Sequence, residues 1–366
     1  MTCVKGKARG SERLLLGGGW SRCLLVAGAV AFGGTACLWG REAPELARFE
    51  FAEPQMGMEF RVVMYAREAG AAREAAAAMF RRVAELNLVL SDYEEESELS
   101  RLNRTAGSGQ AVPVSRDLWR VLEAGQRMAE LSQGAFDMTV GPAVQLWRRA
   151  RRQRELPSPE RLERARAAVG YAYLELDGRT RAVRLTRPGM RLDLGGIAKG
   201  YVLDEALRVL EAHGVRRALV QAGGDVAVGD PPPGRSGWRI ELPWPEGARE
   251  GATQWLLLRR CALATSGDVF QHVEIDGVRY SHILDPRTGV GLTDHSQVSV
   301  IARTGMVADA LATTVSVLGP LEGMALVERA KGVAARVVRL ENGRWETWES
   351  LRWRRYRAPE PAGPRR

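Results

Sequence analysis

The stretch that most restricts the fold of this chain is residues 190–229, where strand-like and helix-like patterns alternate around two glycine pairs. One apolar run leads into Gly195-Gly196, and another leads into Gly223-Gly224. Gly214 lies between the pairs and provides a helix end. Before it, apolar residues recur at the spacing of one helix face: Ile197, Tyr201, Leu207 and Leu210. The predicted order is therefore strand, glycine turn, helix, strand and glycine turn.

The same alternation extends over most of the chain. Residues 58–66 alternate like a half-buried strand, and residues 115–134 read as a helix that Ser115 caps and Gly134 ends. The other predicted elements are a helix in 70–93, a loop and a charged helix in 148–168, short strands at 173–178, 182–186 and 298–302, and a helix over 306–319 that Gly319-Pro320 stops. This pattern predicts an α+β protein with two lobes, a cleft and one continuous core.

Composition narrows the class of protein. Hydrophobic residues make up 45% of the 366, which is enough for a large core. The net charge is +9, and arginines concentrate in 148–168 and 352–366. We interpret these segments as a solvated helix and a frayed terminus, and we expect no nucleic-acid partner, because no nucleic-acid-binding motif accompanies them.

Cys261 is the single cysteine after residue 37, so neither an internal disulfide nor a thiolate metal cluster is expected in the body.

The N-terminus has the pattern of a targeting segment. Five basic residues precede an apolar run at 23–39, which is close to the shortest length that spans a bilayer. The run suits a signal peptide or an uncleaved anchor. Cys37 weakly suggests a lipoprotein site, since Gly34 stands where such sites usually have leucine. A disordered leader is the alternative. We expect residues 1–43 to direct export, with the body membrane-associated on the periplasmic or outer side of the inner membrane.

The Gly195-Gly196 turn is the first candidate binding site. Glycines between a strand and a helix let backbone amides approach a ligand, and the start of a helix favours an anion. Lys199 adds a positive charge nearby, which suits a phosphate or a pyrophosphate. Neither nucleotide-binding glycine fingerprint is present. The alternative is a tight turn that needs small residues, and for Gly223-Gly224 that reading is favoured.

Asp309 and Thr313 form the second candidate site. They are four residues apart, so on a helix they share a face. A carboxylate and a hydroxyl are hard oxygen ligands that suit Mg²⁺, an ion that commonly shares its ligands with substrate phosphates. The alternative is that Asp309 complements the helix dipole and Thr313 faces solvent.

Three further segments carry weaker signals. Phe136 and Asp137 precede a turn, where they could hold a planar ring or serve as a core anchor and a turn cap. Ser266 precedes Gly267 after a predicted strand, and this combination suits a phosphate. His282 is one of four histidines and precedes an Asp-Pro turn, so it is either a catalytic group that titrates near neutral pH or a structural one.

Taken together and in order, these pieces resemble the ApbE-type FAD:protein FMN transferase family. The resemblance runs from about Gln55 to Leu326. It rests on eight segments: "MGMEF", "LSDYEEESELSRLN", "GAFDMTVGPAVQLW", "DLGGIAKGYVLD", "GGDVAVG", "LATSGD", "YSHILDPRTG" and "ADALATTVSVLG". Met58 departs from the family pattern, which usually has threonine there.

The resemblance implies a T-fold-related, two-lobed domain over residues 44–350 with FAD in the cleft. The composition of residues 351–366, which carry no family motif, predicts a basic, disordered tail after it. Its reaction moves the FMN half of FAD to a Thr or Ser hydroxyl of a target flavoprotein, releases AMP and requires Mg²⁺. The implied FAD contacts are Met56, Tyr93, Ala135, Phe136, Asp137, Lys199 and Val202, to which the residue patterns add Gly195, Gly196 and Ser266. The implied metal ligands are the main-chain oxygen of Ala198 with Asp309 and Thr313.

Several alternatives stay open at this point. His282 would lie by the reacting phosphates and take the hydroxyl proton, and Asp285 is the rival base. A metal-dependent FAD pyrophosphatase would use the same residues, with water in place of the acceptor hydroxyl. An exported flavin-binding protein without catalysis is the third hypothesis. Membrane association through the N-terminal segment is expected in each case.

Overall fold

The computed structural model describes residues 45–245, 247–248, 253–268 and 272–359. The predicted leader at 1–43 and the last part of the predicted tail, 360–366, lie outside the described residues.

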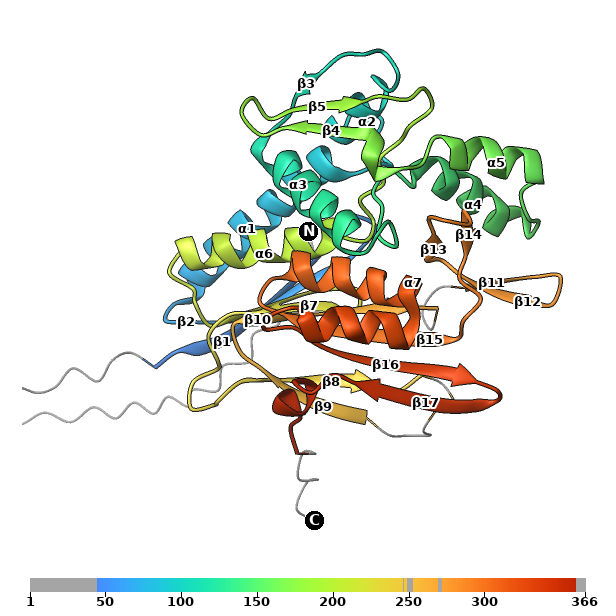
Figure 1. Ribbon diagram of the computed structural model, residues 1–366. Coiled ribbons are helices and arrows are strands. Elements are labelled where there is room, and N and C mark those ends of the chain that lie inside the picture. The colour runs from blue at the N-terminus through green and yellow to red at the C-terminus, as the bar shows by residue number, and fades with distance from the viewer. Residues whose placement is uncertain (1–44, 246, 249–252, 269–271, 360–366) are drawn as a thin grey trace, which may run out of the picture. The chain divides into compact units, whose positions relative to one another are not determined.

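A single antiparallel sheet organises the described part of the chain (Figure 1). Its eight strands follow the order β1-β2-β6-β7-β10-β15-β16-β17. Their bounds are β1 Ala47–Gln55, β2 Met58–Ala66, β6 Ala218–Ala222, β7 Asp225–Val228, β10 Cys261–Gly267, β15 Ser296–Ala302, β16 Ala334–Glu341 and β17 Arg344–Glu349. The strands predicted at 58–66 and 298–302 are therefore confirmed, and both lie inside the sheet.

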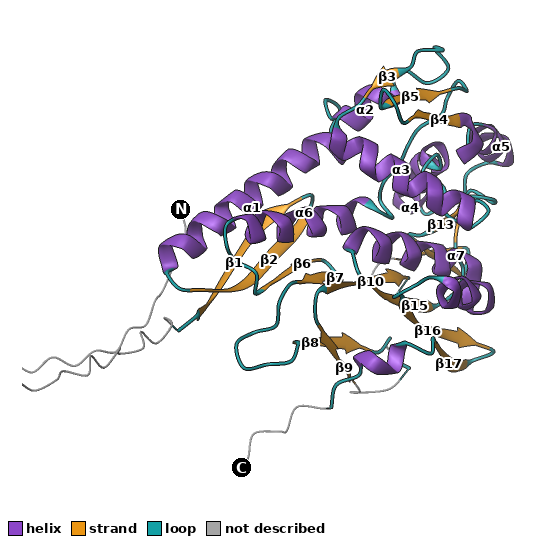
Figure 2. Cartoon of the chain, turned by 60° about the vertical axis from the view of Figure 1, so that its left-hand side comes forward, coloured by secondary structure: helices purple, strands orange, loops and turns teal. Residues whose placement is uncertain are grey.

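Three long helices cover one face of this sheet (Figure 2). They are α1 Ala69–Leu90, α6 Ala198–Ala212 and α7 Gly305–Arg329, and α6 packs between the other two. The predicted end of a helix at Gly319-Pro320 is only partly right. Gly319 adopts a φ of 76° and kinks α7, but Pro320 fits the first turn of a new helical stretch that runs on to Arg329. By length and composition α7 could cross a membrane, but here it packs on β10 and β15 as a core helix.

A smaller core lies on the opposite face of the sheet. The hairpin of β8 Trp238–Pro243 and β9 Thr253–Leu258 packs there, together with the short 3-10 helix η2 Trp353–Tyr356. Trp353 is fully buried in this core. The prediction of a disordered tail from residue 351 is therefore wrong for residues 351–359. The arginine-rich composition obscured Trp353 and Tyr356, whose apolar surface holds the segment in place.

Trp353→Ala is expected to lower the free energy of unfolding by about 3–5 kcal/mol, because it removes a fully buried indole and leaves a cavity. Urea unfolding followed by circular dichroism measures this change. Leu351→Ala is the matched control, since Leu351 is 83% exposed, and it is expected to stay within about 0.5 kcal/mol of wild type. Equal unfolding curves for Trp353→Ala and wild type would contradict the packing of this segment.

The remaining elements gather near the helix-covered side of the sheet (Figure 1). The helices are α2 Glu98–Asn103, α3 Arg116–Leu131, α4 Gly141–Gln153, α5 Pro159–Ala167 and η1 Tyr171–Tyr173, and the strands are β3 Val112–Pro113, β4 Leu174–Asp177, β5 Ala182–Leu185, β11 His272–Ile275, β12 Val278–Ser281, β13 Leu284–Asp285 and β14 Val290–Gly291. Ser115 caps α3 as predicted, since its side chain accepts a hydrogen bond from the Leu118 amide.

Two local predictions in this region are wrong. Residues 148–153 belong to α4 and not to a loop, so the arginine-rich segment is helical before Pro157 as well as after it. Residues 190–194 form no strand, and only Arg191 takes part in an isolated bridge, with Val140. The Asn103 side chain instead bonds both the N–H and the C=O of Leu192, at 2.7 and 3.1 Å, and so replaces a strand partner.

Candidate active site

A large cavity brings most of the sequence-predicted residues together. Its volume is about 1600 Å³, and its walls come from the β1–β2 turn, the segment after α1, the start of α6, the β6–β7 turn and β10. The predicted residues that line it are Met56, Tyr93, Gly195, Ala198, Lys199 and His282. These six come from four separate segments, so the fold unites residues that the sequence placed far apart.

Glycines at the start of α6 allow neighbouring elements to pack closely against it. A side chain at Gly196 would meet the Thr313 Oγ1 at 2.9 Å and the Phe136 ring at 3.3 Å. At Gly200 it would lie 2.1 Å from the Gly305 carbonyl oxygen, so α6 and α7 touch through their backbones. Asp204 on α6 also accepts hydrogen bonds from the first amides of α7, including that of Gly305 at 2.6 Å. These contacts place Lys199 on α6 beside Asp309 on α7.

A cluster of one lysine and two buried carboxylates forms where these helices meet the sheet. The Lys199 ammonium lies 2.6 Å from a carboxylate oxygen of Asp225, at the start of β7. The other oxygen of Asp225 accepts a hydrogen bond from the Thr265 amide at 2.9 Å. Asp309 accepts one from the Gly200 amide at 3.0 Å. One lysine thus faces two carboxylates, both nearly inaccessible to solvent.

The ionisation of this cluster follows from its burial. Burial alone would lower the pKa of Lys199, but Asp225 and Asp309 together hold that pKa above its usual value. Burial raises the pKa of Asp309 to about 7, although Lys199 opposes the shift. Asp225 was not among the predicted site residues. The signal for it was its position directly after Gly223-Gly224, which the sequence favoured as a plain turn.

The predicted metal ligands share one place in the fold. Asp309 and Thr313 lie one turn apart on α7, and Ala198 begins α6 directly before Lys199. Among the described residues, no group of three or more His, Cys, Asp or Glu side chains could hold a metal ion. A metal here would rely on one carboxylate, a hydroxyl and a main-chain oxygen, with other ligands from water or substrate. That set of hard oxygens fits Mg²⁺.

The two rival bases have different surroundings. His282 is exposed and lines the cavity. Asp285 is not among the lining residues. Its carboxylate pairs with the Arg287 guanidinium at 2.8 Å, and its carbonyl oxygen accepts the Gly289 amide at 2.8 Å. The Trp147 indole donates to the Ser281 carbonyl at 3.1 Å and fixes the residue before His282. Asp285 therefore shapes the turn, and His282 faces the space where a substrate can enter.

Several predicted FAD contacts lie behind the cavity wall and not on it. Asp137 is buried and accepts hydrogen bonds from the amide and hydroxyl of Thr139, both at 2.7 Å, and from the Tyr171 amide at 2.9 Å. Burial raises the pKa of Asp137. Ala135 packs with Ile283, beside His282. The arrangement of Ala135, Phe136 and Asp137 thus matches the core anchor and turn cap that the sequence allowed as the alternative.

Val202 and Ser266 also fall outside the lining of the cavity. Val202 is fully buried in the main core, so its side chain has no path to a ligand in this arrangement. Ser266 lies on β10 between Thr265 and Gly267, which do line the cavity. Since neighbouring residues of a strand point to opposite faces, the Ser266 side chain points away from it.

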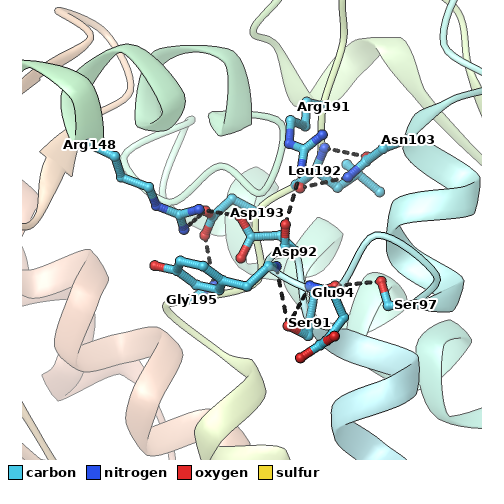
Figure 3. A network of polar contacts seen from close by, with 11 residues as sticks. Ser91, Asp92, Glu94, Ser97, Asn103, Arg148, Arg191, Leu192, Asp193 and Gly195 are labelled. Carbon is cyan, nitrogen blue, oxygen red and sulfur yellow. Dashed lines mark hydrogen bonds and ion pairs between the residues drawn. The ribbon is translucent and has the colours of Figure 1, made fainter. Parts of the chain in front are cut away.

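Sequence reasoning missed two polar networks near the cavity. In the first, His295 lies 2.9 Å from the buried carboxylate of Asp268, which also accepts the Ser296 amide and pairs with Arg279. The spacing of residues does not indicate this contact, because His295 and Asp268 are 27 positions apart along the chain. The second network joins Asp92, Arg148 and Asp193, and Figure 3 shows it beside Gly195.

Known proteins resemble the chain over most of its length. The sequence model of the ApbE family matches residues 56–337. The chain is 35% identical over 299 residues to the FAD:protein FMN transferase of Treponema pallidum (strain Nichols), covering 78% of this chain and 82% of that protein. It is 32% identical over 319 residues to the protein of the same name from Vibrio cholerae serotype O1, covering 86% and 94%.

Solved structures share its fold. The flavin transferase ApbE from Vibrio cholerae superposes with a TM-score of 0.77 at 29% identity, covering 85% of this chain and 99% of that one. The ApbE protein from Thermotoga maritima gives 0.75 at 30% identity, covering 86% and 100%. These likenesses confirm the predicted α+β fold. Sequence and structure agree that the chain belongs to the ApbE family.

Proposed function

We propose that this protein transfers the FMN half of FAD to a Thr or Ser hydroxyl of an acceptor flavoprotein and releases AMP. The observation that carries the proposal is the buried cluster of Lys199, Asp225 and Asp309 beside a cavity that Tyr93 and His282 also line. The names of the relatives from Treponema pallidum and Vibrio cholerae support the same reaction.

The cavity offers distinct places for the two halves of FAD. Met56 and the 74%-exposed ring of Tyr93 provide apolar and aromatic surface for the isoalloxazine ring. The Gly195 turn and Lys199, at the start of α6, provide positive potential for the pyrophosphate. The volume of about 1600 Å³ exceeds the roughly 300–1,000 Å³ of ordinary small-molecule sites. A segment of the acceptor can therefore enter beside FAD.

The reaction is a phosphoryl substitution. The acceptor oxygen forms a bond to the FMN-side phosphorus, the bond from that phosphorus to the bridging oxygen breaks, and AMP leaves with that oxygen. His282 takes the proton from the acceptor hydroxyl, since it is the titratable side chain of the 280–289 loop that lines the cavity. Lys199 stays protonated and balances negative charge on the pyrophosphate.

Mg²⁺ fits the oxygen ligands near Lys199. The main-chain oxygen of Ala198, the Asp309 carboxylate and the Thr313 hydroxyl would hold it. When bound, it supplies positive charge that neutralises the pyrophosphate and favours the departure of AMP. Burial raises the pKa of Asp309, and a cation bound beside it would favour the charged carboxylate.

FAD hydrolysis is the second candidate function. The exposure of His282 favours it, because water can reach the same position as an acceptor hydroxyl. Simple flavin binding is less well supported, since binding alone requires no buried cluster of opposite charges.

Release of AMP from FAD, followed by chromatography with and without an acceptor flavoprotein, separates the two reactions. A transferase releases AMP faster when the acceptor is present, in step with loss of free FAD and without an equal amount of free FMN. A hydrolase releases AMP and free FMN in equal amounts at a rate that the acceptor does not change.

We also propose that the protein is exported and acts membrane-associated, outside the cytoplasm. The basic residues and apolar run within residues 1–43 support this. Cell fractionation of the full chain tests it, and recovery of the protein in the cytoplasmic fraction alone would contradict it.

A further inference from the structure

We propose that Arg148 is a positioning residue for FAD: it holds the Tyr93 wall of the cavity to the Gly195 turn by pairing with one carboxylate in each. The assignment rests on the proposed function, because FAD is taken as the ligand of the cavity. It gives a role to the first residue of an arginine-rich segment whose composition alone indicated only a solvated helix.

The bridge is direct on both sides. One terminal nitrogen of Arg148 lies 2.5 Å from a carboxylate oxygen of Asp92, and the other lies 2.8 Å from one of Asp193. The second oxygen of Asp193 accepts the Gly195 amide at 2.8 Å. Figure 3 shows the guanidinium beside Asp193 and Asp92, with Gly195 next to Asp193. The chain of contacts therefore runs from α4 to the residues that precede α6.

The same guanidinium also contacts the Tyr93 ring. Its carbon lies 4.2 Å from the ring centroid, which is a cation–π distance. The loop around Tyr93 is held in addition by the Ser91 hydroxyl, which accepts the amides of Tyr93 and Glu94 at 3.2 and 3.3 Å. Tyr93 is nevertheless largely exposed, so its side chain depends on neighbours such as Arg148 for a fixed orientation.

The positive charge of Arg148 compensates the negative charges of Asp92 and Asp193. Its side chain is 25% exposed, and those of Asp92 and Asp193 are only 9% and 11% exposed. Burial, and then the negative charge of Asp92, raise the pKa of Asp193. Without the guanidinium, two largely buried carboxylates would repel each other next to a site that takes a diphosphate. Removing one partner of a buried ion pair leaves such uncompensated charge, which is strongly unfavourable.

Arg148→Met is expected to weaken FAD binding by about tenfold or more, which corresponds to about 1.4 kcal/mol. The turnover number at saturating FAD should change by less than about threefold, because Arg148 does not touch the reacting atoms. Fluorescence titration of FAD without acceptor measures the affinity, and steady-state kinetics with acceptor measure KM and kcat separately.

Three further variants distinguish positioning from general stability. Arg149→Met is the matched control on the same helix, and it should bind FAD like wild type. Arg149 is exposed, and among the residues that the structure describes its guanidinium bonds the exposed Gln153. Arg148→Lys should lie between Arg148→Met and wild type, because lysine keeps the charge but lacks the fork that reaches both carboxylates. Adding Asp92→Asn to Arg148→Met should recover part of the lost affinity, since it removes one unpaired carboxylate.

Hydrogen exchange of the free protein gives a second readout that needs no ligand. Arg148→Met should exchange faster at the amides of Tyr93 and Gly195, while α7 remains unchanged. If Arg148→Met does not fold, the same comparisons are made with Arg148→Lys. FAD affinity within twofold of wild type, or no recovery on adding Asp92→Asn, would overturn the assignment. Wild-type protein that binds FAD but transfers no FMN would instead overturn the proposed function. In that case the FAD affinities of wild type and the Arg148 variants would still decide the role of Arg148.

Discussion

Asp309→Ala is expected to lower the rate of FMN transfer by about 10²–10³-fold, the loss typical when a preorganised electrostatic group is removed from an active site. The Asp309 side chain extends from α7 to the start of α6, where its carboxylate accepts the Gly200 amide. It lies next to Lys199 and one helical turn from Thr313. Its removal takes away the one carboxylate of the proposed Mg²⁺ site. AMP release measured over a range of Mg²⁺ concentrations should show both the slower rate and a weaker dependence on the metal.

Glu322→Gln is the matched control for this experiment, because Glu322 is an exposed carboxylate on the same helix, and it should retain wild-type activity. If Asp309→Ala kept both its turnover and its Mg²⁺ dependence, the assignment of Asp309 as a metal ligand would be wrong.

Removing the charge of Asp309 should stabilise the metal-free protein, although removing the side chain slows the reaction. The pKa of Asp309 is about 7 in the fold, compared with an ordinary value of 3.8. Between these two pH values the folded state holds the proton and the unfolded chain does not. The free energy of unfolding therefore falls as pH rises through this range, and the destabilising effect of Asp309 is largest above pH 7. Asp309→Asn should therefore be more stable than wild type at pH 8 in EDTA, with a smaller difference at pH 5. Urea unfolding at both values measures this, and a difference that does not grow with pH would contradict it.

His282→Ala should slow FMN transfer by about 10²–10⁴-fold, the usual contribution of a general base, while FAD still binds. The exposed residue lines the cavity, and the nearby Asp285, whose carboxylate pairs with Arg287, is not among the lining residues. The variant should also lose the pH dependence that a general base gives to the rate. Single-turnover rates from pH 5.5 to 8.5 measure both effects.

His213→Ala provides the control here, since His213 lies exposed at the end of α6, away from the residues that line the cavity. Asp285→Asn should loosen the turn and reduce the rate less than His282→Ala does. An unchanged pH profile in His282→Ala, together with a larger loss in Asp285→Asn, would identify Asp285 as the base.

Local signals in the sequence predicted much of the fold. The alternation in residues 58–66 and the Ser115 cap before α3 depend on neighbours within a few positions, and the structure confirms both. The segment at 190–194 has an equally strand-like pattern but forms no strand, because its main partner is the side chain of Asn103 on α2. Such a partner is separated by 89 positions and leaves no periodic trace in the sequence.

In the site, too, residues within local motifs were predictable from the sequence, and residues that act through distant contacts were not. Gly195, Lys199 and His282 could be named because motifs carried them, and they do line one cavity. Asp225 and Arg148 could not, since their importance comes from contacts between distant elements: β7 with α6, and α4 with the loop after α1. Ion pairs of this kind follow from the tertiary fold and not from the spacing of residues along the chain.

The most direct test of the proposed transfer uses the full chain with FAD, Mg²⁺ and exported candidate flavoproteins from the same cell. After denaturing electrophoresis, the account predicts a fluorescent acceptor band, with the flavin located on one Thr or Ser by mass spectrometry. Asp309→Ala should yield a far weaker band after the same reaction time. Steady formation of FMN and AMP with no labelled acceptor in the whole set would contradict the transferase assignment and favour FAD hydrolysis.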